Sequence, residues 1–466
     1  MESTTLEFPQ EIVNAVVGHY AIQTDSKALK TLGLVSRAWS HPTREHLFRA
    51  IMIDMKAFPS LQERLDALKS LLQAKPLLCQ YIKSLTIEVG TFLQSLESLH
   101  PDADFDSLMW MDDPVDVLSL LASLTHVTHV AVGVRERSNY LRPRCIPYYF
   151  QAALQSLFAR PHVTSISLSY IKIDLIPLTQ YHHIEELALH GVGVPSWSQD
   201  CCFPMNRLPT TPRCLRGLSL SMVYPEVWRV LALCCASPEA TLSLRKTKEL
   251  AVSTGEFTAY STEDFTSIDT LANEQWSTIF DTYGGAVESY TLRQYSYHKL
   301  SPTFASLRSF PNLNQLSLEI LYERVSYHGE HGSMPVLVQA LEECSQLDEP
   351  SNLTSIRVTY FGCAEYITLN DLKAQGEQNL WARLDGILEG HTFSSLKEVV
   401  FTIKFYCCTT SLGGEQCAAL ANMFHTQFFP SLSRRGILAL RFHHVIRSDG
   451  DPFFEPPHIV KTYLGS

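Results

Sequence analysis

The sequence lacks any segment that would place the protein in or across a membrane. Within its 466 residues, charge, proline, serine or threonine interrupts every leucine-rich run before it reaches the roughly 18 to 20 apolar residues that span a bilayer. The first residues, from Met1 to Pro9, contain neither the basic stretch nor the apolar core of a secretory signal peptide. We therefore expect a soluble protein of the cytoplasm or nucleus, with no membrane partner.

Positive charge is also scarce. The chain has 37 lysines and arginines against 48 aspartates and glutamates, which gives a net charge of -11. Proteins that bind nucleic acid usually carry an excess of positive charge. Nucleic acid is therefore not expected as a partner.

The motifs of common enzyme and metal sites are missing. The sequence has no Gly-x-x-x-x-Gly-Lys-Ser/Thr, Gly-x-Gly-x-x-Gly, Gly-x-Ser-x-Gly or His-Glu-x-x-His. Its 12 cysteines form no Cys-x-x-Cys, and adjacent pairs at 201–202, 234–235 and 407–408 suit neither zinc ligation nor a disulfide framework. We expect reduced thiols, no catalytic residue, no metal and no cofactor, and hence a protein that is not an enzyme.

What is present predicts three short helices in the first fifty residues. Asp25 and Ser26 offer N-caps for the second helix, and Ser40 with Pro42 offers a start for the third. The first helix has one apolar face, made of Ile12, Val13, Val16, Val17 and Tyr20. A unit this small buries too little surface to be stable alone, so it implies a docking partner or a following domain.

Three segments of this region, taken in order, resemble the F-box, and most closely the F-box-like group of mushroom-forming fungi. They are Phe8-Pro9-Gln10-Glu11-Ile12, Leu34-Val35-Ser36-Arg37-Ala38-Trp39 and His46-Leu47-Phe48-Arg49. Phe8 replaces the usual leucine, and the first interhelical loop, Tyr20 to Lys27, is longer than usual.

The resemblance implies a module that binds a Skp-family adaptor and, through it, a cullin ubiquitin ligase. The residues that it implies at this contact are Phe8, Pro9, Ile12, Val35 and Trp39. The alternative is an ordinary helical cap on the following domain.

The rest of the chain repeats the pattern apolar-x-x-apolar-x-apolar, often after an amphipathic stretch. Such helix-then-strand units favour a parallel sheet. The nine clearest triads are Ile82-Leu85-Ile87, Val127-Val130-Val132, Val163-Ile166-Leu168, Ile184-Leu187-Leu189, Leu215-Leu218-Leu220, Val287-Tyr290-Leu292, Leu313-Leu316-Leu318, Leu353-Ile356-Val358 and Leu396-Val399-Phe401.

Several of these units are similar to leucine-rich repeats. Their spacing of roughly 21 to 45 residues is irregular, and the asparagine or cysteine that usually follows the strand is missing. We predict an α/β fold in which an F-box-like helical module at 6–53 precedes an irregular leucine-rich-repeat-like solenoid with a parallel sheet at 54–446, with tails at 1–5 and 447–466. The competing fold is two ordinary α/β domains.

In such a solenoid the residues between the apolar positions project onto the exposed strand face, which these proteins use for binding. The candidate target-binding residues on this face are Thr86, Glu88, Ser167, Glu186, His190, Gln315, Glu319, Arg357 and Thr359. The predicted function is the substrate-recognition subunit of a Skp/cullin/F-box ubiquitin ligase, acting on an unknown protein target. The alternative is a repeat scaffold for protein interactions without a ligase link.

An acidic segment resembles a calcium loop only in part. Asp102, Asp104, Asp106 and Asp113 have the oxygen spacing, but Ser107 stands where the loop needs a turn glycine. Because the oxygens cannot easily wrap around the ion without that turn, we predict no micromolar calcium binding. Calorimetric titration with calcium chloride checks this, and micromolar binding that Asp104→Ala abolishes would contradict it.

Overall fold

The protein is described from a computed structural model. It describes residues 9–22, 26–54, 60–88, 120–134, 144–146, 148–181, 183–194, 215–221, 225–236, 246–255, 279–282, 284–295, 306–322, 333–346, 350–363, 380–407, 414–446 and 460–465. The chain divides into two compact units, of which the first comprises 1–136, 142–187 and 192–202 and the second 137–141, 188–191 and 203–466.

Three helices open the first unit, as the sequence predicts. They are α1 (Gln10–Ile22), α2 (Ser26–Leu32) and α3 (Arg37–Leu47). Their own small core contains the buried side chains of Val13, Val17 and Leu29, with Trp39 packed against it. One boundary was wrong: α3 begins at Arg37, with Pro42 inside it, and not at Ser40.

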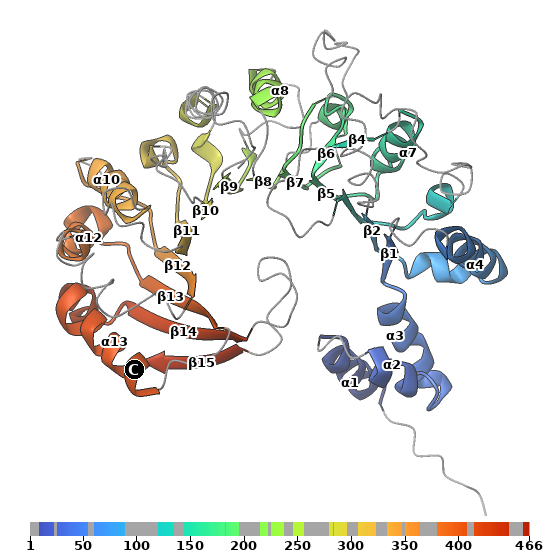
Figure 1. Cartoon of the computed structure of the whole chain (residues 1–466), viewed down its shortest axis with the longest axis horizontal. Helices are drawn as coiled ribbons and strands as arrows, with labels where there is room; N and C mark the ends of the chain where they lie inside the picture. Colours follow the sequence, from blue (N-terminus) through green and yellow to red (C-terminus); the bar gives the residue numbers. More distant parts are fainter. Residues whose placement is uncertain are drawn as a thin grey trace, which may run out of the picture. The chain divides into compact units, whose positions relative to one another are not determined.

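The strands follow one another in chain order within each unit (Figure 1). In the first unit they are β1 (Ala50–Asp54), β2 (Ser84–Glu88), β3 (His129–Gly133), β5 (Ser165–Ser169) and β7 (Glu186–His190), the last of which extends into the second unit. A separate parallel pair consists of β4 (Arg144–Cys145) and β6 (Ile171–Lys172). The remaining strands are β8 (Gly217–Ser221), β9 (Glu249–Gly255), β10 (Ser289–Tyr295), β11 (Gln315–Tyr322), β12 (Ser355–Cys363), β13 (Glu398–Cys407), β14 (Leu438–Ile446) and β15 (Val460–Gly465).

The pairings of β1 with β2, β2 with β3 and β3 with β5 are parallel, and so is each successive pairing from β8 to β14. The prediction of an α/β fold with a parallel sheet is confirmed. The strand β15, in the segment expected as a tail, pairs with β14 in the antiparallel sense.

Helices cover one face of the strands. They are α4 (Ser60–Ala74) and α7 (Tyr148–Phe158) in the first unit, and α8 (Pro225–Ala236), α10 (Ser333–Ser345), α12 (Leu380–Glu389), α13 (Gly414–Met423) and α14 (Pro430–Arg434) in the second. In the second unit, Figure 1 shows α10, α12 and α13 along the same side of β11 to β14. Every side chain of the nine predicted triads is at most 5% exposed, so these residues form the core between strands and helices. No helix in the described ranges is long and apolar enough to cross a bilayer.

Nine neighbouring pairs of described strands are linked through a single backbone carbonyl. The carbonyl of the residue before a strand accepts hydrogen bonds of 2.8 to 3.2 Å from two successive N–H groups at the start of the following strand. The accepting carbonyls belong to Arg49, Lys83, Thr128 and Thr164 in the first unit and to Arg216, Lys248, Glu288, Asn314 and Thr354 in the second.

Asparagine side chains add to this ladder in two consecutive repeats. Asn312 Nδ2 donates to the carbonyl of Gly285 at 2.7 Å, and Asn352 Nδ2 donates to the carbonyl of Pro311 at 3.1 Å. Both asparagines lie before their strand, whereas the asparagine of a regular leucine-rich repeat follows the strand. They donate to carbonyls in turns of the preceding repeat.

A buried carboxylate on helix α12 forms hydrogen bonds with the start of helix α14. Asp385 of α12 is 4% exposed, and its two oxygens accept hydrogen bonds from the backbone N–H groups of Ser431 and Leu432 at 2.9 and 3.0 Å. These N–H groups lie in the first turn of α14, where the helix supplies no acceptor for them. A side chain 46 residues earlier in the chain therefore caps this helix.

We predict that Asp385→Asn lowers the free energy of unfolding of the second unit by about 2 to 3 kcal/mol, because one buried N–H then faces an amide donor. The control is Glu389→Gln on the same helix, whose exposed carboxylate accepts from Ser431 Oγ, and we expect a change below about 1 kcal/mol. Urea denaturation followed by tryptophan fluorescence measures both, and equal effects would contradict the capping role.

Candidate functional site

The three-helix unit exposes apolar side chains despite having its own core. Ile12 of α1 is 48% exposed, and Leu34 and Val35, in the turn before α3, are 87% and 63% exposed. Pro9 is exposed as well, whereas Trp39 is half-buried against the core and so supports the unit from within. Phe8 lies outside the described residues. Leu34 was missed as a site residue, although it opens the second F-box-like segment.

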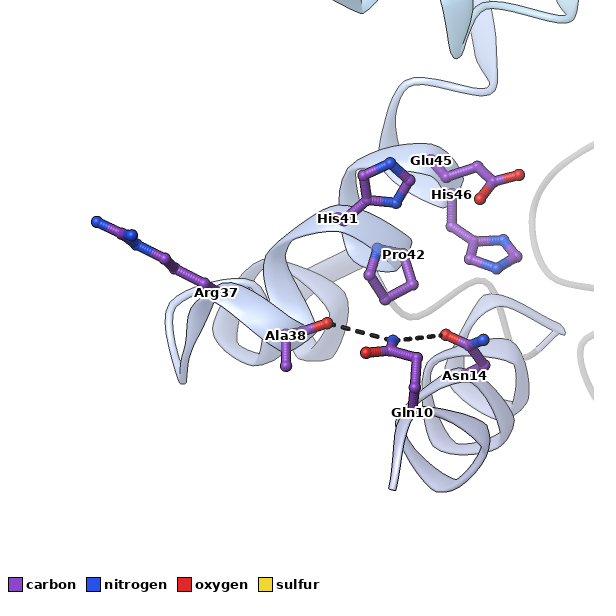
Figure 2. Close-up of a pocket in the computed structure, with 8 residues that line it drawn as sticks. All are labelled: Gln10, Asn14, Arg37, Ala38, His41, Pro42, Glu45 and His46. Atoms are coloured by element: carbon purple, nitrogen blue, oxygen red, sulfur yellow. Dashed lines mark hydrogen bonds between the residues drawn. The ribbon is translucent and has the colours of Figure 1, made fainter. Parts of the chain in front are cut away.

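A groove of about 600 Å³ runs between α1 and α3 (Figure 2). Proline has no N–H, so Pro42 leaves the carbonyl of Ala38 without its helical donor. Gln10 Nε2 donates to this carbonyl at 3.5 Å and to Asn14 Oδ1 at 3.0 Å. The side chain of Gln10 therefore links the two helices at the point where Pro42 interrupts the hydrogen bonding of α3.

The same unit is also attached to the repeats. The carbonyl of Arg49, two residues after α3, accepts from the N–H groups of Lys83 and Ser84 and so begins the ladder of the sheet. The ring centroids of His41 on α3 and Tyr81 before β2 lie 5.5 Å apart, edge to face. The last of the three helices therefore contacts the segment that leads into β2.

In the first unit the register brings several candidate target-binding residues into rows on the outward strand face. Thr86 lies beside Ala131, which lies beside Ser167, and Glu88 lies beside Gly133. Glu186 is exposed at the start of β7. Each alternates with a buried triad residue, so all four candidates of this unit lie on the outward face.

In the second unit the polar rows are longer and contain ion pairs across strands. Glu319 lies beside Thr359, and Arg293 Nε of β10 contacts Glu319 Oε2 at 3.0 Å. Arg357 Nη2 contacts Glu398 Oε2 of the next strand at 3.7 Å. Gln315 is exposed at the start of β11. These ion pairs join charged side chains of neighbouring strands.

The remaining candidate, His190, lies at the end of β7 and is partly buried. Its Nδ1 shares a hydrogen bond of 2.7 Å with Ser221 Oγ of β8. Burial, together with the positive charge of Arg293, lowers the pKa of His190 to about 4. Ser221 is only 7% exposed, so this hydrogen bond lies within the buried part of the two strands.

The described residues contain no group of three or more His, Cys, Asp or Glu side chains that could hold a metal ion. The acidic segment at 102–113 lies outside them. Among the described cysteines, Cys79, Cys344 and Cys417 are free, and burial raises the pKa of Cys344 to about 11. At neutral pH this thiol is therefore protonated and weakly nucleophilic.

Comparison with known protein families finds no match, and comparison with curated proteins finds none either. The two surfaces described above, one on the three-helix unit and one on the strand face, are therefore the basis for a functional assignment.

We predict that acidification weakens the fold through His190. The folded pKa of about 4 lies below the unfolded value near 6.5, so the folded state binds fewer protons between these values. Stability present above pH 6.5 should be lost progressively as the pH falls towards 4. Substituting His190→Gln should flatten this part of the profile of melting temperature against pH, whereas substituting the exposed His162→Gln should not. An unchanged profile in the His190 variant would exclude this role.

Proposed function

We propose that this protein is a substrate-recognition subunit of a Skp/cullin/F-box ubiquitin ligase. The observation that carries the proposal is the exposed apolar set of Ile12, Leu34 and Val35 on a three-helix unit that already has its own core. Exposed side chains of this size are typical of a surface that another protein covers. Two of the three, Ile12 and Val35, are residues that the F-box resemblance implies at the adaptor contact.

In this proposal the two surfaces have separate tasks. The three-helix unit binds a Skp-family adaptor, which links the protein to a cullin in the cytoplasm or nucleus. The outward strand face holds a protein target. The protein itself performs no chemistry, in keeping with the buried Ser221 beside His190.

The second candidate function is a repeat scaffold without a ligase link. It is supported by the contact of the His41 ring on α3 with the Tyr81 ring before β2, because this contact attaches the last helix to the first strands. Solenoids need a cap to cover their terminal repeat.

Co-purification separates the two functions. We predict that the full chain retains a Skp-family adaptor and that a Leu34→Ala, Val35→Ala double variant loses it, since truncation of an interface anchor costs about 2 to 4 kcal/mol of association. Both residues are exposed, so the melting temperature should stay close to that of the wild type. A Phe8→Ala, Pro9→Ala double variant tests the first F-box-like segment in the same way.

The matched control is Leu77→Ala in the short helix at Pro76–Gln80, whose side chain is 68% exposed outside the three-helix unit. It should bind the adaptor as the wild type does. If both double variants retain the adaptor fully, the contact does not involve these residues. If the wild type fails to bind any Skp-family adaptor, the scaffold function is favoured.

A further inference from the structure

The groove between α1 and α3 has opposite charges at its two ends. Its volume of about 600 Å³ lies within the range of roughly 300 to 1,000 Å³ that is usual for ligand pockets. Figure 2 shows Arg37 at one end and Glu45 at the other, and both side chains are exposed. In the part of the chain that the structure describes, neither side chain has an ion-pair or hydrogen-bond partner. The groove therefore offers a cation at one end and a carboxylate at the other.

The dipole of α3 disfavours both of these charges. A helix is stabilised by an acidic side chain near its N-terminus and by a basic side chain near its C-terminus. Arg37 is the first residue of α3 and Glu45 lies in its last turn, so each has the opposite sign. Since the two charges do not stabilise their own helix, recognition of a ligand explains them better than stability does.

Polar groups line the groove between its charged ends. On α1, Gln10 Nε2 donates to Asn14 Oδ1 at 3.0 Å, and among the described residues this leaves Gln10 Oε1 to accept and Asn14 Nδ2 to donate. The two amides thereby present the same kinds of donor and acceptor as a peptide bond. On α3, His41 and His46 add ring nitrogens to the lining. The lining therefore suits the backbone of a peptide better than an apolar ligand.

The distance between the charged ends determines the spacing of the charges that a ligand needs. Arg37 and Glu45 are eight positions apart in one helix, which corresponds to about 12 Å along its axis. An extended peptide rises about 3.3 Å per residue, so two of its residues four positions apart lie about 13 Å from each other. A peptide with one acidic and one basic residue at this spacing therefore reaches both ends of the groove.

We propose that the groove between α1 and α3 binds an extended peptide segment of a partner protein. The segment has an acidic residue at the Arg37 end and a basic residue, four positions away, at the Glu45 end. This surface is separate from the proposed adaptor contact, because Ile12, Leu34 and Val35 are not among the residues that line the groove. The proposal therefore does not rest on the ligase link.

The test uses the full chain and four fluorescein-labelled peptides of equal length. The first is Gly-Glu-Ser-Ala-Ser-Arg-Gly, and the others have two glutamates, two arginines or two glutamines at the charged positions. We expect fluorescence anisotropy to show the tightest binding for the mixed peptide, by at least about threefold over either like-charge peptide. The reason is that each like-charge peptide places one of its charges at an end of the same sign. Sodium chloride should weaken the binding of the mixed peptide.

A single charge change at either end should switch this preference. In Arg37→Glu both ends are acidic, so the peptide with two arginines should bind best, and in Glu45→Arg both ends are basic, so the peptide with two glutamates should bind best. Each change gives α3 the sign that its dipole favours, so neither should lower the melting temperature. The control, a Glu11→Gln, Lys30→Gln double variant, removes one exposed charge of each sign outside the groove lining and should keep the wild-type preference.

A second measurement locates the bound peptide. The side-chain amide signal of Asn14, followed by NMR, should shift when the mixed peptide is added to the wild type, because Asn14 lines the groove. The Glu45→Arg variant should retain a Skp-family adaptor as the wild type does, so a failure here is distinct from a failure of the ligase proposal.

Several outcomes would overturn the proposal. They are no binding of the mixed peptide, the same order of affinities in both single variants as in the wild type, and an unchanged signal of Asn14. Loss of the adaptor in Glu45→Arg would assign the groove to the adaptor contact. A change of oligomeric state in either single variant would assign it to a second copy of the chain.

Discussion

Nine of the described strands, namely β2, β3, β5, β7 and β9 to β13, begin at a single backbone carbonyl of the preceding repeat, which accepts hydrogen bonds from two successive N–H groups. Parallel strands cannot be joined by a tight turn, so the chain must leave the sheet and return to it in the correct register with the preceding strand. The shared carbonyl sets this register. It belongs to Arg49 for β2 and to Thr354 for β13. Because the register is thereby constant, connections of very different length can be tolerated between the strands.

A constant register has a direct effect on the two faces of the sheet. Side chains alternate along a strand, so a one-residue shift would move a whole triad to the outward face. With the register held, Leu316 and Leu318 stay in the core while Gln315 and Glu319 stay outside. Charged groups on the outward face then meet partners on the next strand, as Arg293 meets Glu319.

The three-helix unit combines two requirements that conflict in such a small structure. It needs a core, which Val13, Val17 and Leu29 provide, and it presents Leu34 and Val35 to its surroundings. The His41 ring on its last helix contacts the Tyr81 ring before β2 and so attaches the unit to the strands that follow. The exposed side chains are therefore not part of the core of the unit.

The sequence by itself determined the elements whose signal is local. Alternation and spacing located all nine triads and the outward residues between them, and helical periodicity located the three N-terminal helices. Only the tertiary structure decided which distant groups meet: Ser221 with His190, Asp385 with the first turn of α14, and Gln10 with the carbonyl that Pro42 leaves without a donor. The start of α3 at Arg37 was missed because proline usually marks the first turn of a helix, whereas here a glutamine from another helix offsets its missing hydrogen bond. Periodicity depends on neighbours along the chain, but these contacts depend on the register between strands and on the packing of helices, which no local pattern encodes.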